Sequence, residues 1–556
     1  MIGPALALGV QGYRHRWIAD DGLIVTRTVR QILAGNGPVF NVGERAEANT
    51  STLWTFLMTL LASTGLRPDK TAVYTGLLCS MIGLALAIDG TRRWHLARTG
   101  TTAATRSAQR WMLPAGCLVV LALPPFWDFA TSGLETGLVT AWIGLVWWAL
   151  VWLDRHREAG WRRLVPMAVL FGLGELVRPD LGLVTAVFGA AAWLLTRPSW
   201  PRTLLLAAVA VALPVAYEIF RMGYYGVVVP NTAIAKEAQS SNWHTGYLYL
   251  RNFTDPYWLW LPALLLVLAL AVAVRHQLTS RAGLADLIVP AAALTAAVLL
   301  AFYIVKVGGD FMHGRMLLPA AFCALLPVMV LPYRPLLTPA VVAVAVWAAV
   351  CAVSLRVDVI GHNTFADERQ FWINATGVKH PATDDAYFRL EKQTPQIYEA
   401  ERRHVLVYAD GLTHFRYAPI AYHQRVKGAT EAWVLGTDGA VNSVDTLSID
   451  ELGLSYPLSA HQQIATRGRP GHEKWLPNYW VLADYTPPNF TPDGVDAGKL
   501  KAARHALSCG ALAELQHAVR DPMTLSRFWH NLTGAWRRTQ LRYPVDPYAA
   551  ERKFCR

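Results

Sequence analysis

The sequence has few charged residues for its length. Only 16% of its 556 residues are charged, whereas 53% are hydrophobic and the mean hydropathy is +0.26. Soluble domains carry about 25% charged residues. The deficit lies in residues 1–355, where long apolar runs follow one another, while residues 356–556 have the composition of a water-soluble domain. The sequence therefore predicts a polytopic α-helical membrane domain, 1–355, followed by a soluble domain, 356–556.

Cysteines are also scarce, and no metal-binding pattern is present. Four of the six cysteines lie in apolar runs, and the other two, Cys509 and Cys555, are free to pair if the C-terminal domain lies in an oxidising compartment. No zinc or haem spacing occurs, and "HEK" at 472–474 lacks the second histidine of a zinc-protease helix. No Lys/Arg run with interleaved aromatics occurs, so nucleic acid is not expected as a partner. The net charge of +12 is typical of the basic cytoplasmic loops of a membrane protein.

The apolar segments predict about eleven membrane spans. The opening "MIGPALALGVQGY" lacks the basic start and the cleavage site of a signal peptide, and it is expected to be a first span without its upstream part. A span needs about 20 apolar residues. The predicted spans are 1–13, 71–91, 111–127, 137–153, 164–177, 181–196, 203–220, 258–274, 284–305, 316–333 and 337–355. The shorter run 51–66 is expected to be a re-entrant or interfacial helix.

Arginines fall in alternate loops between these spans. The basic loops contain Arg92, Arg93, Arg98, Arg106 and Arg110, then Arg155, Arg157, Arg162 and Arg163, then Arg197 and Arg202, then Arg275 and Arg281, then Arg334. Cytoplasmic loops carry the excess of Lys and Arg. The remaining loops and the whole C-terminal domain are therefore predicted to lie outside a plasma membrane. The strand-like runs "HVLVYADG" and "EAWVLG" predict an α/β fold for that outer domain.

The first outer loop contains two adjacent carboxylates. In "WIADDGLIVTRTVR", Asp20 and Asp21 precede an amphipathic helical pattern. Asp21 could simply be the N-cap of that helix. A second carboxylate at the membrane boundary is costly unless it is used, and a carboxylate beside a lipid-borne substrate could act as a general base.

Other polar residues gather in the same outer loops. The segment "GNGPVFNVGERAEANTSTLW" and later loops contain residues that could bind a sugar or an acceptor: Asn41, Glu44, Glu47, Asn49, Glu135, Tyr224, Asn231, Asp310 and His472. Cations that suit a phosphate group are Lys236, Lys306, His313, Arg315 and Arg178. Taken one at a time, these residues could equally be solvated, snorkelling or ion-paired. Their occurrence on one predicted side favours a shared site.

Several motifs resemble GT-C glycosyltransferases that use polyprenyl-phosphate sugars. They are "ADDGLIVTRTVRQILAGNGPVFNVGERAEANTSTLW", "FATSGLETGL", "YYGVVVPNTAIAK", "GGDFMHGRMLLPA" and "GRPGHEKW". Together they are most similar to the AftB family of actinobacterial terminal β-(1→2) arabinofuranosyltransferases. The resemblance implies a GT-C fold and transfer of arabinofuranose from decaprenylphosphoryl arabinose to the arabinan of arabinogalactan and lipoarabinomannan.

The resemblance also implies roles for individual residues. Family members place a catalytic acid in the first outer loop, which corresponds here to Asp20 or Asp21. The donor phosphate would be bound by some of the five cations named above. The sequence does not demand a metal, although two adjacent acids could hold a divalent cation.

Three other functions remain open at this stage. Another GT-C transferase, such as a mannosyltransferase using polyprenyl-phosphate mannose, would have similar residues. A transporter is predicted to have repeated halves with broken helices, and no internal repeat occurs. A non-catalytic wall-binding membrane protein would keep its function when Asp20 is replaced by Asn.

Overall fold

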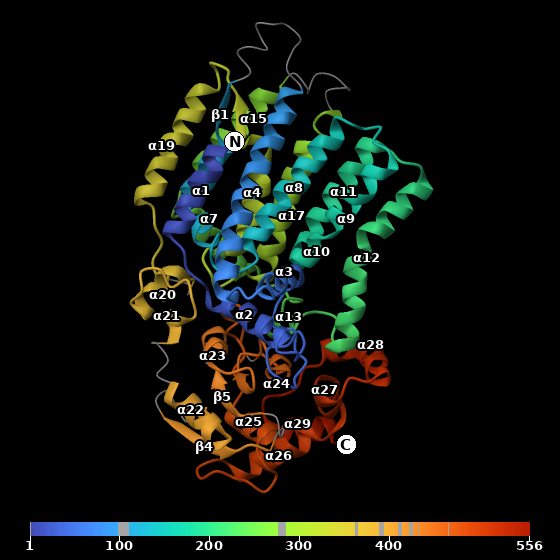
Figure 1. The fold of residues 1–556 in the computed structure, drawn as a ribbon, viewed down its shortest axis with the longest axis vertical. Helices are drawn as coiled ribbons and strands as arrows, with labels where there is room; N and C mark the ends of the chain where they lie inside the picture. The colour runs from blue at the N-terminus through green and yellow to red at the C-terminus, as the bar shows by residue number, and fades with distance from the viewer. Residues whose placement is uncertain are drawn as a thin grey trace.

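The protein consists of a helical bundle with a smaller mixed part at one end. A computed structural model describes residues 2–97, 111–275, 285–361, 365–388, 394–409, 414–421, 426–432, 434–464 and 466–555. Figure 1 shows the bundle above and the C-terminal part below. The bundle helices are α1 (Ile2–Arg14), α4 (Pro68–Leu96), α8 (Thr136–Asp154), α9 (Trp161–Gly172), α10 (Gly174–Val177), α11 (Gly182–Thr196), α12 (Trp200–Tyr224), α15 (Trp260–Val274), α17 (Ile288–Val307), α18 (Leu318–Leu325) and α19 (Thr338–Ser354).

Five described helical segments are long and apolar enough to cross a membrane. They are α4, α8, Pro179–Thr196, α12 and α17. At about 1.5 Å per residue, even the 19 residues of α8 approach the thickness of a bilayer core. Shorter apolar helices include α15, α19 and α3 (Thr52–Ala62), and the 11 residues of α3 agree with the expectation of a short, non-spanning helix at 51–66. The chain is therefore a mostly helical membrane protein.

The predicted span at 111–127 is wrong as a continuous helix. The structure divides it into strand β1 (Met112–Pro114), helix α6 (Gly116–Ala122) and helix α7 (Pro124–Asp128). The break falls at Leu123, whose ψ of 117° is extended, because a residue that precedes a proline is driven out of the helical region. Strand β1 pairs antiparallel with β2 (Val330–Pro332), which also ends the predicted span 316–333 as a strand.

The basic loops gather at the end of the bundle opposite the C-terminal part. Helix α4 begins beside that part, where Arg67 binds Asp384, and carries Arg92 and Arg93 near its other end at Leu96. At the far end Arg334, before α19, donates to Val272 in the last turn of α15. The chain directions in Figure 1 place the turns after α8 and α11 there too. Arg98, Arg106, Arg110 and Arg281 lie outside the described residues.

Helices α4 and α8 pack along a seam of glycines. A Cβ at Gly137 would collide with the carbonyl of Gly76, and one at Gly144 with the carbonyl of Gly83. The pairs are seven residues apart on each helix, which is two helical turns, so the two backbones touch repeatedly along one face. The seam fixes the start of α8, where Glu135 is the N-cap.

The C-terminal part contains a four-stranded mixed sheet. Its order is β4 (Phe415–Pro419), β3 (Val405–Ala409), β5 (Gly428–Ala432) and β6 (Thr446–Asp450), with β3 antiparallel to β4 and parallel to β5, and β5 parallel to β6. The helices are α20 (Glu368–Thr376), α21 (Asp385–Phe388), α22 (Thr394–Arg403), α23 (Leu435–Val441), α24 (Pro457–Ala460), α25 (Asn478–Tyr485), α26 (Ala497–Leu507), α27 (Gly510–Arg520), α28 (Leu525–Gln540) and α29 (Pro547–Phe554). Trp480 of α25 and Leu500 of α26 are fully buried in a core shared with Leu406 and Leu447 of the sheet.

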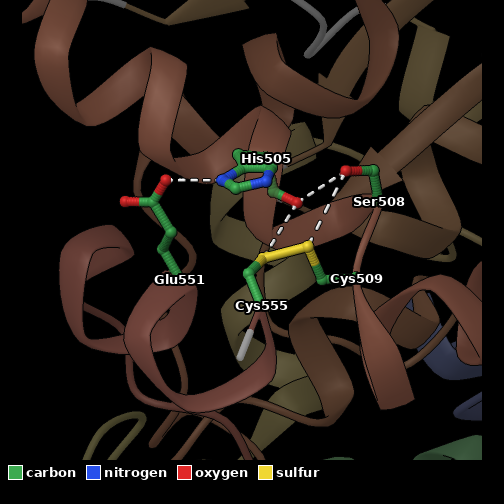
Figure 2. Close-up of a disulfide and its surroundings, with 5 residues drawn as sticks. All are labelled: His505, Ser508, Cys509, Glu551 and Cys555. Atoms are coloured by element: carbon green, nitrogen blue, oxygen red, sulfur yellow. Dashed lines mark hydrogen bonds and ion pairs between the residues drawn. A yellow bond between two sulfur atoms is a disulfide. The ribbon is translucent and has the colours of Figure 1, made fainter.

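A disulfide joins Cys509 to Cys555, as the sequence suggests it could. Their Cα atoms are 5.1 Å apart, and the bond ties the end of α29 to the start of α27 (Figure 2). His505 beside it binds Glu551 through Nδ1 at 2.6 Å. The other four cysteines are free.

The two parts are joined through helix α2 (Asp20–Leu33). Arg27 of α2 is fully buried and donates to the carbonyls of Asn442, Ser443 and Thr446 at 2.7–2.8 Å. These carbonyls follow the C-terminus of α23, where a helix dipole favours a cation. Helix α2 therefore holds α23 against the bundle.

Candidate functional site

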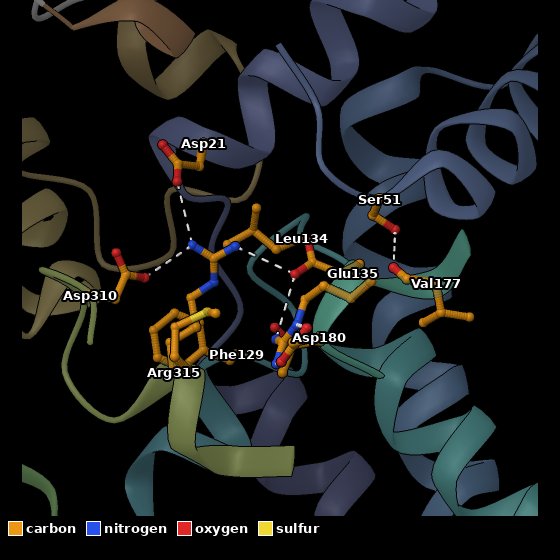
Figure 3. A network of polar contacts seen from close by, with 12 residues as sticks. Asp21, Ser51, Phe129, Leu134, Glu135, Val177, Asp180, Asp310 and Arg315 are labelled. Atoms are coloured by element: carbon orange, nitrogen blue, oxygen red, sulfur yellow. Dashed lines mark hydrogen bonds and ion pairs between the residues drawn. The ribbon is translucent and has the colours of Figure 1, made fainter. Parts of the chain in front are cut away.

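An open pocket lies where the bundle meets the C-terminal part. It contains about 1200 Å³ of empty space and is lined from both parts, by Asp21 and Val25 of α2, Glu135, Arg178, Asp310, Arg315, helix α13 (Asn231–Ala235) and Pro470. The hydroxyl of Ser51 donates to the carbonyl of Val177 at 2.6 Å and closes one side (Figure 3). The lining is mixed, with apolar side chains beside charged ones.

The turn after α17 brings Asp310 and Arg315 into the pocket. Helix α17 ends at Gly308, which has a φ of 99° that favours glycine, and Gly314 at 69° turns the chain back. Tyr249 of α14 (Trp243–Thr254) fixes the turn by donating to the carbonyl of Met312 and accepting from the amide of Met316. The sequence pattern "GGDFMHGR" thus positions an acid and a cation on one side.

Arg315 is surrounded by three carboxylates. Its Nη1 lies 3.4 Å from Asp21 Oδ2 and 3.3 Å from Asp310 Oδ2, and its Nη2 lies 3.5 Å from Glu135 Oε1. Figure 3 shows the guanidinium between the three acids, which come from α2, the start of α8 and the turn after α17. Arg315 is buried, so these contacts are little screened by solvent.

A second buried arginine shares Glu135. Arg178 binds Asp180 with two parallel hydrogen bonds of 2.6 Å, and its Nη1 lies 3.8 Å from Glu135 Oε1. Arg178 Nη1 and Arg315 Nε are buried without a hydrogen-bond partner. Native proteins rarely leave such donors unpaired, so the pocket has the capacity to bind an anion.

Lys236 lies at the edge of the same pocket. Its Nζ is 3.9 Å from Asp310 Oδ1 and 6.0 Å from the centre of the Phe311 ring. The loop 468–474 of the C-terminal part lies against it, because a Cβ at Gly471 would come within 3.1 Å of Lys236 Cε. Arg469, from the same loop, also lies over the Phe311 ring, with its guanidinium carbon 4.6 Å from the ring centre. The C-terminal part therefore contributes to the cationic side of the pocket.

The two adjacent aspartates have different surroundings. Asp20 accepts hydrogen bonds from the amides of Gly436 and Thr437 and from the Thr437 hydroxyl, at 3.1, 2.7 and 2.9 Å. Burial, followed by the negative charge of Asp21, raises the pKa of Asp20 to about 6, although these hydrogen bonds oppose the rise. Asp21 lines the pocket and faces Arg315. Neither is an N-cap, because Ala19 occupies that position of α2.

The aspartate pair does not form a cation site in this arrangement. The Asp20 carboxylate is already occupied by three donors, and the nearest charged partner of Asp21 is a guanidinium that would repel a metal ion. Among the described residues, the metal-ligand cluster that the geometry brings together is His505, Cys509 and Cys555, whose sulfurs are joined in the disulfide. The suggested divalent cation at Asp20 and Asp21 is therefore not supported.

Several predicted sugar-binding residues hold the fold together outside the pocket. Asn41 exchanges two hydrogen bonds with the backbone of Ser448, and Asn231 donates to the carbonyls of Gly453 and Leu454. Glu44 accepts from Tyr485 and Arg520, and Glu47 accepts from Tyr217 and Arg221. Tyr224 stacks on Phe220.

The remaining predicted residues divide between the pocket and its surroundings. Asn49 lines the pocket, whereas His472 lies behind it against Phe311. His313 is buried between Tyr257 and Asn252, at 2.9 and 2.7 Å, and burial lowers its pKa to about 3, so it carries no charge for a phosphate. Lys306 is exposed at the end of α17 and does not line the pocket.

One acid near the site was not predicted. Glu368, the first residue of α20, is buried, accepts from Trp372 Nε1 at 3.1 Å and leaves Oε2 without a hydrogen-bond partner. Burial, then the charges of Asp21 and Asp20, raise the pKa of Glu368 to about 8. It lies far along the chain in a segment without an apolar run, and no sequence signal relates it to the first loop.

Two known proteins of the same name are similar to almost the whole chain. The family model described as the AftB family C-terminal domain matches residues 417–549. A protein of Mycobacterium tuberculosis named terminal β-(1→2)-arabinofuranosyltransferase is 35% identical, over 98% of this chain and 94% of its own. A protein of the same name from Corynebacterium glutamicum is 37% identical, over 94% of this chain and 82% of its own. No solved structure matches the chain.

Proposed function

This chain belongs to the family of terminal β-(1→2)-arabinofuranosyltransferases, and from that membership we propose its donor, its acceptor and its catalytic residue. It is a membrane glycosyltransferase of cell-wall arabinan synthesis. The proposed donor is decaprenylphosphoryl arabinose, and the proposed acceptor is an arabinan terminus of arabinogalactan or lipoarabinomannan. A lipid-linked donor suits a pocket that opens at one end of a transmembrane bundle.

The observation that carries the proposal is the presence of two buried arginines, Arg315 beside Asp21 and Arg178 beside Glu135, each with one donor atom that makes no hydrogen bond. The donor phosphate would bind Arg178 Nη1 and Arg315 Nε, with Lys236 at the edge of the pocket. Arginine suits a phosphate because its donors match the phosphate oxygens. The apolar lining from α2 and α17, including Val25 and Val307, would contact the start of the lipid chain.

In this proposal Asp21 acts on the reacting sugar. The bond between the anomeric carbon and the donor phosphate breaks, a bond to the acceptor hydroxyl oxygen forms, and the hydroxyl proton leaves. Asp21 would either accept that proton as a general base, or attack the anomeric carbon as a nucleophile and be displaced in a second step by the acceptor hydroxyl, whose proton passes to the released phosphate. The departing polyprenyl phosphate keeps the electron pair, and the nearby guanidinium groups would stabilise its charge without an acid.

The pocket end is proposed to face the outside of the plasma membrane. The described arginines of the basic loops lie at the opposite end, as expected for cytoplasmic loops. The Cys509–Cys555 disulfide supports an oxidising compartment for the C-terminal part. Both substrates, a membrane lipid and a wall glycan, are then reachable from the pocket.

The test is arabinose incorporation by purified Asp21→Asn protein in lipid nanodiscs. Labelled decaprenylphosphoryl arabinose and a synthetic arabinan acceptor are supplied, with polyprenyl-phosphate mannose as the competing donor. Loss of the charge is expected to lower the rate on the order of 10²–10⁴-fold. Asp255→Asn, which changes an exposed partner of Arg251, is the matched control and should keep the wild-type rate. Wild-type turnover by Asp21→Asn would overturn the assignment of Asp21.

A further inference from the structure

On helix α28, polar side chains are buried and large aromatic side chains are exposed, which is the reverse of the usual distribution on a water-facing helix. Its buried residues include Asn531, Arg538 and Thr539, whereas Trp529 and Trp536 are exposed by 56% and 63%. Two of the buried side chains donate to the rest of the protein, Asn531 to the carbonyl of Ala518 of α27 and Arg538 to the carbonyl of Gly226. The polar side of α28 is therefore bound to the protein, and its apolar side is left uncovered.

Four apolar side chains form one stripe along α28; Leu525, Trp529 and Trp536 are exposed and Leu532 is half-buried. At about 100° per residue, Leu525, Trp529, Leu532 and Trp536 fall within about 60° of one another. We call these four residues the α28 stripe. Leu525, at one end of it, is exposed by 75%. An exposed apolar stripe with two tryptophans is uncommon on a water-facing helix.

The α28 stripe is continuous with the surface of a membrane-spanning helix. Phe528, next to the stripe on the helix, lies against Gly223 in the last turn of α12, where a Cβ would collide with its ring. Only 6% of the apolar window of α12 is buried inside the protein, so one side of that helix is open to lipid. Figure 1 shows α28 directly at the pocket end of α12.

Other exposed aromatic side chains lie toward the same end of the bundle. Trp243 and Tyr247 of α14, Trp258, and Trp260 at the start of α15 are exposed at the pocket end of the bundle. A second set, Trp111, Trp161, Trp193, Trp200 and Tyr333, is exposed near the helix ends at the opposite side. Two aromatic bands of this kind are typical of the two interfaces of a bilayer.

We propose that α28 is an interfacial helix whose stripe inserts into the bilayer surface beside the pocket end of α12. The tryptophans would lie at the headgroup level, where amphipathic rings are favoured. His530 and Arg537, on the adjoining side of the helix, would face anionic lipid headgroups. The helix thereby ties the C-terminal part to the membrane and sets the depth of the pocket relative to the lipid.

Spin labels on the full chain test this placement. Trp529→Cys and Trp536→Cys are labelled with a nitroxide in a Cys79→Ser background, without reducing agent, and reconstituted in nanodiscs of phosphatidylglycerol and phosphatidylcholine. His530→Cys and Arg537→Cys are the matched controls, each one residue away on the same helix. Collisions of the label with oxygen, which concentrates in lipid, are compared with collisions with a water-soluble nickel chelate.

The stripe positions are expected to show a severalfold higher oxygen-to-nickel ratio than the controls. Equal, water-like ratios at all four positions would overturn the proposal and leave the stripe open to another ligand, such as a glycan. Dipolar broadening between labels of two molecules would also overturn it, because a second copy would then cover the stripe. Each labelled protein must keep the wild-type melting temperature, and Leu525→Cys replaces any stripe variant that does not.

Discussion

Asp20 and Asp21 are neighbours in the chain but point about 100° apart around α2. Asp20 accepts three hydrogen bonds from the start of α23, and Asp21 faces Arg315 across the pocket. Gly436 permits this contact, since a Cβ there would collide with the carbonyl of Asp20. One carboxylate thus positions the C-terminal part, and the other is left for chemistry.

Asp20→Asn is therefore expected to weaken the fold more than the chemistry. An amide has one acceptor oxygen, so either the donors at Thr437 or the one at Gly436 lose their partner, which costs about 1–3 kcal/mol of the free energy of unfolding. Thermal unfolding of Asp20→Asn beside Asp21→Asn measures the difference. An Asp20→Asn protein with wild-type stability and no transfer would show that the two roles are reversed.

Glu368 is expected to make stability depend on pH near neutrality. Its pKa of about 8 is raised above the usual 4.3 of a glutamate by burial and then by Asp21 and Asp20, so the folded protein binds the proton more tightly than the unfolded chain. The stability that this proton contributes is complete below about pH 4 and is lost as the pH rises through about 8. Melting temperatures of wild type and Glu368→Gln between pH 6 and 9 test this.

The wild-type melting temperature should fall relative to that of Glu368→Gln over this range, because glutamine cannot ionise. Parallel curves for the two proteins would mean that Glu368 is already charged at neutral pH. The transfer rate of Glu368→Gln, measured in the same samples, reports separately whether the acid affects Asp21.

Sequence reasoning identified part of the pocket and could not identify the rest. Asp21, Glu135, Arg178, Asp310 and Arg315 were predicted to share a side, and the structure brings them together because their loops all end at the C-terminal part. The polar residues Asn41, Glu44, Glu47 and Asn231 looked equally suitable, but each is used by a partner remote in sequence. Which polar side chain is already bound depends on tertiary contacts that residue type does not reveal.

At the scale of elements, the contact between α2 and α23 determines how the C-terminal part sits on the bundle. Arg27 donates to five carbonyls, of Phe40, Gly439, Asn442, Ser443 and Thr446. Three of these, Asn442, Ser443 and Thr446, follow the end of α23, where Asn442 is the C-cap. A guanidinium supplies enough donors for this array, whereas an ammonium group has three in a different geometry.

Arg27→Lys is thus expected to loosen α23 although the charge is kept. Several buried carbonyls lose their donors, and the free energy of unfolding should fall by roughly 2–4 kcal/mol. Arg30→Lys, a half-buried neighbour with carbonyl partners in the same segment, is the control and should lose less. Limited proteolysis of the 433–445 region and thermal unfolding measure the effect, and equal losses in the two variants would count against a special role for Arg27.

Long, strongly apolar elements were predicted well, whereas the segment broken by two adjacent prolines was not. Helices α4, α8 and α12 each contain a predicted span, and α17 covers most of the predicted span 284–305, because an uninterrupted apolar run has few alternatives to a helix. The segment 111–127 is equally apolar, yet Pro124 and Pro125 break it, and its first residues pair with β2 instead. Composition located that segment in the bundle and could not determine its shape.

At the scale of the whole molecule, the two ends of the bundle differ in charge and in shape. One end carries the pocket and the C-terminal part, and the other carries the described arginines of the basic loops. When 51–66 is not counted as a span, the predicted spans place the basic loops at one end and the other loops at the opposite end, which is consistent with this separation. The assignment of sides follows from the Lys/Arg rule.

Membrane-impermeant maleimide should therefore label the two ends differently in intact cells. Lys501→Cys, exposed on α26, is expected to react, and Glu158→Cys, exposed after α8, is expected to react only after the cells are opened. A cysteine at Arg92, near the end of α4, should behave like the one at 158. Labelling of Glu158→Cys in intact cells, with protection of Lys501→Cys, would invert the proposed orientation.

The glycine seam between α4 and α8 has a consequence for the design of inhibitors. Where two backbones touch at Gly76, Gly83, Gly137 and Gly144, no side chain is present that could rotate to make room. Glu135 stands directly at the end of this seam, so the wall of the pocket that it forms is stiff. A compound designed for the pocket must therefore fit that wall without any rearrangement of it. Larger substituents are better placed toward Lys236 and the loop 468–474, where long side chains can change conformation.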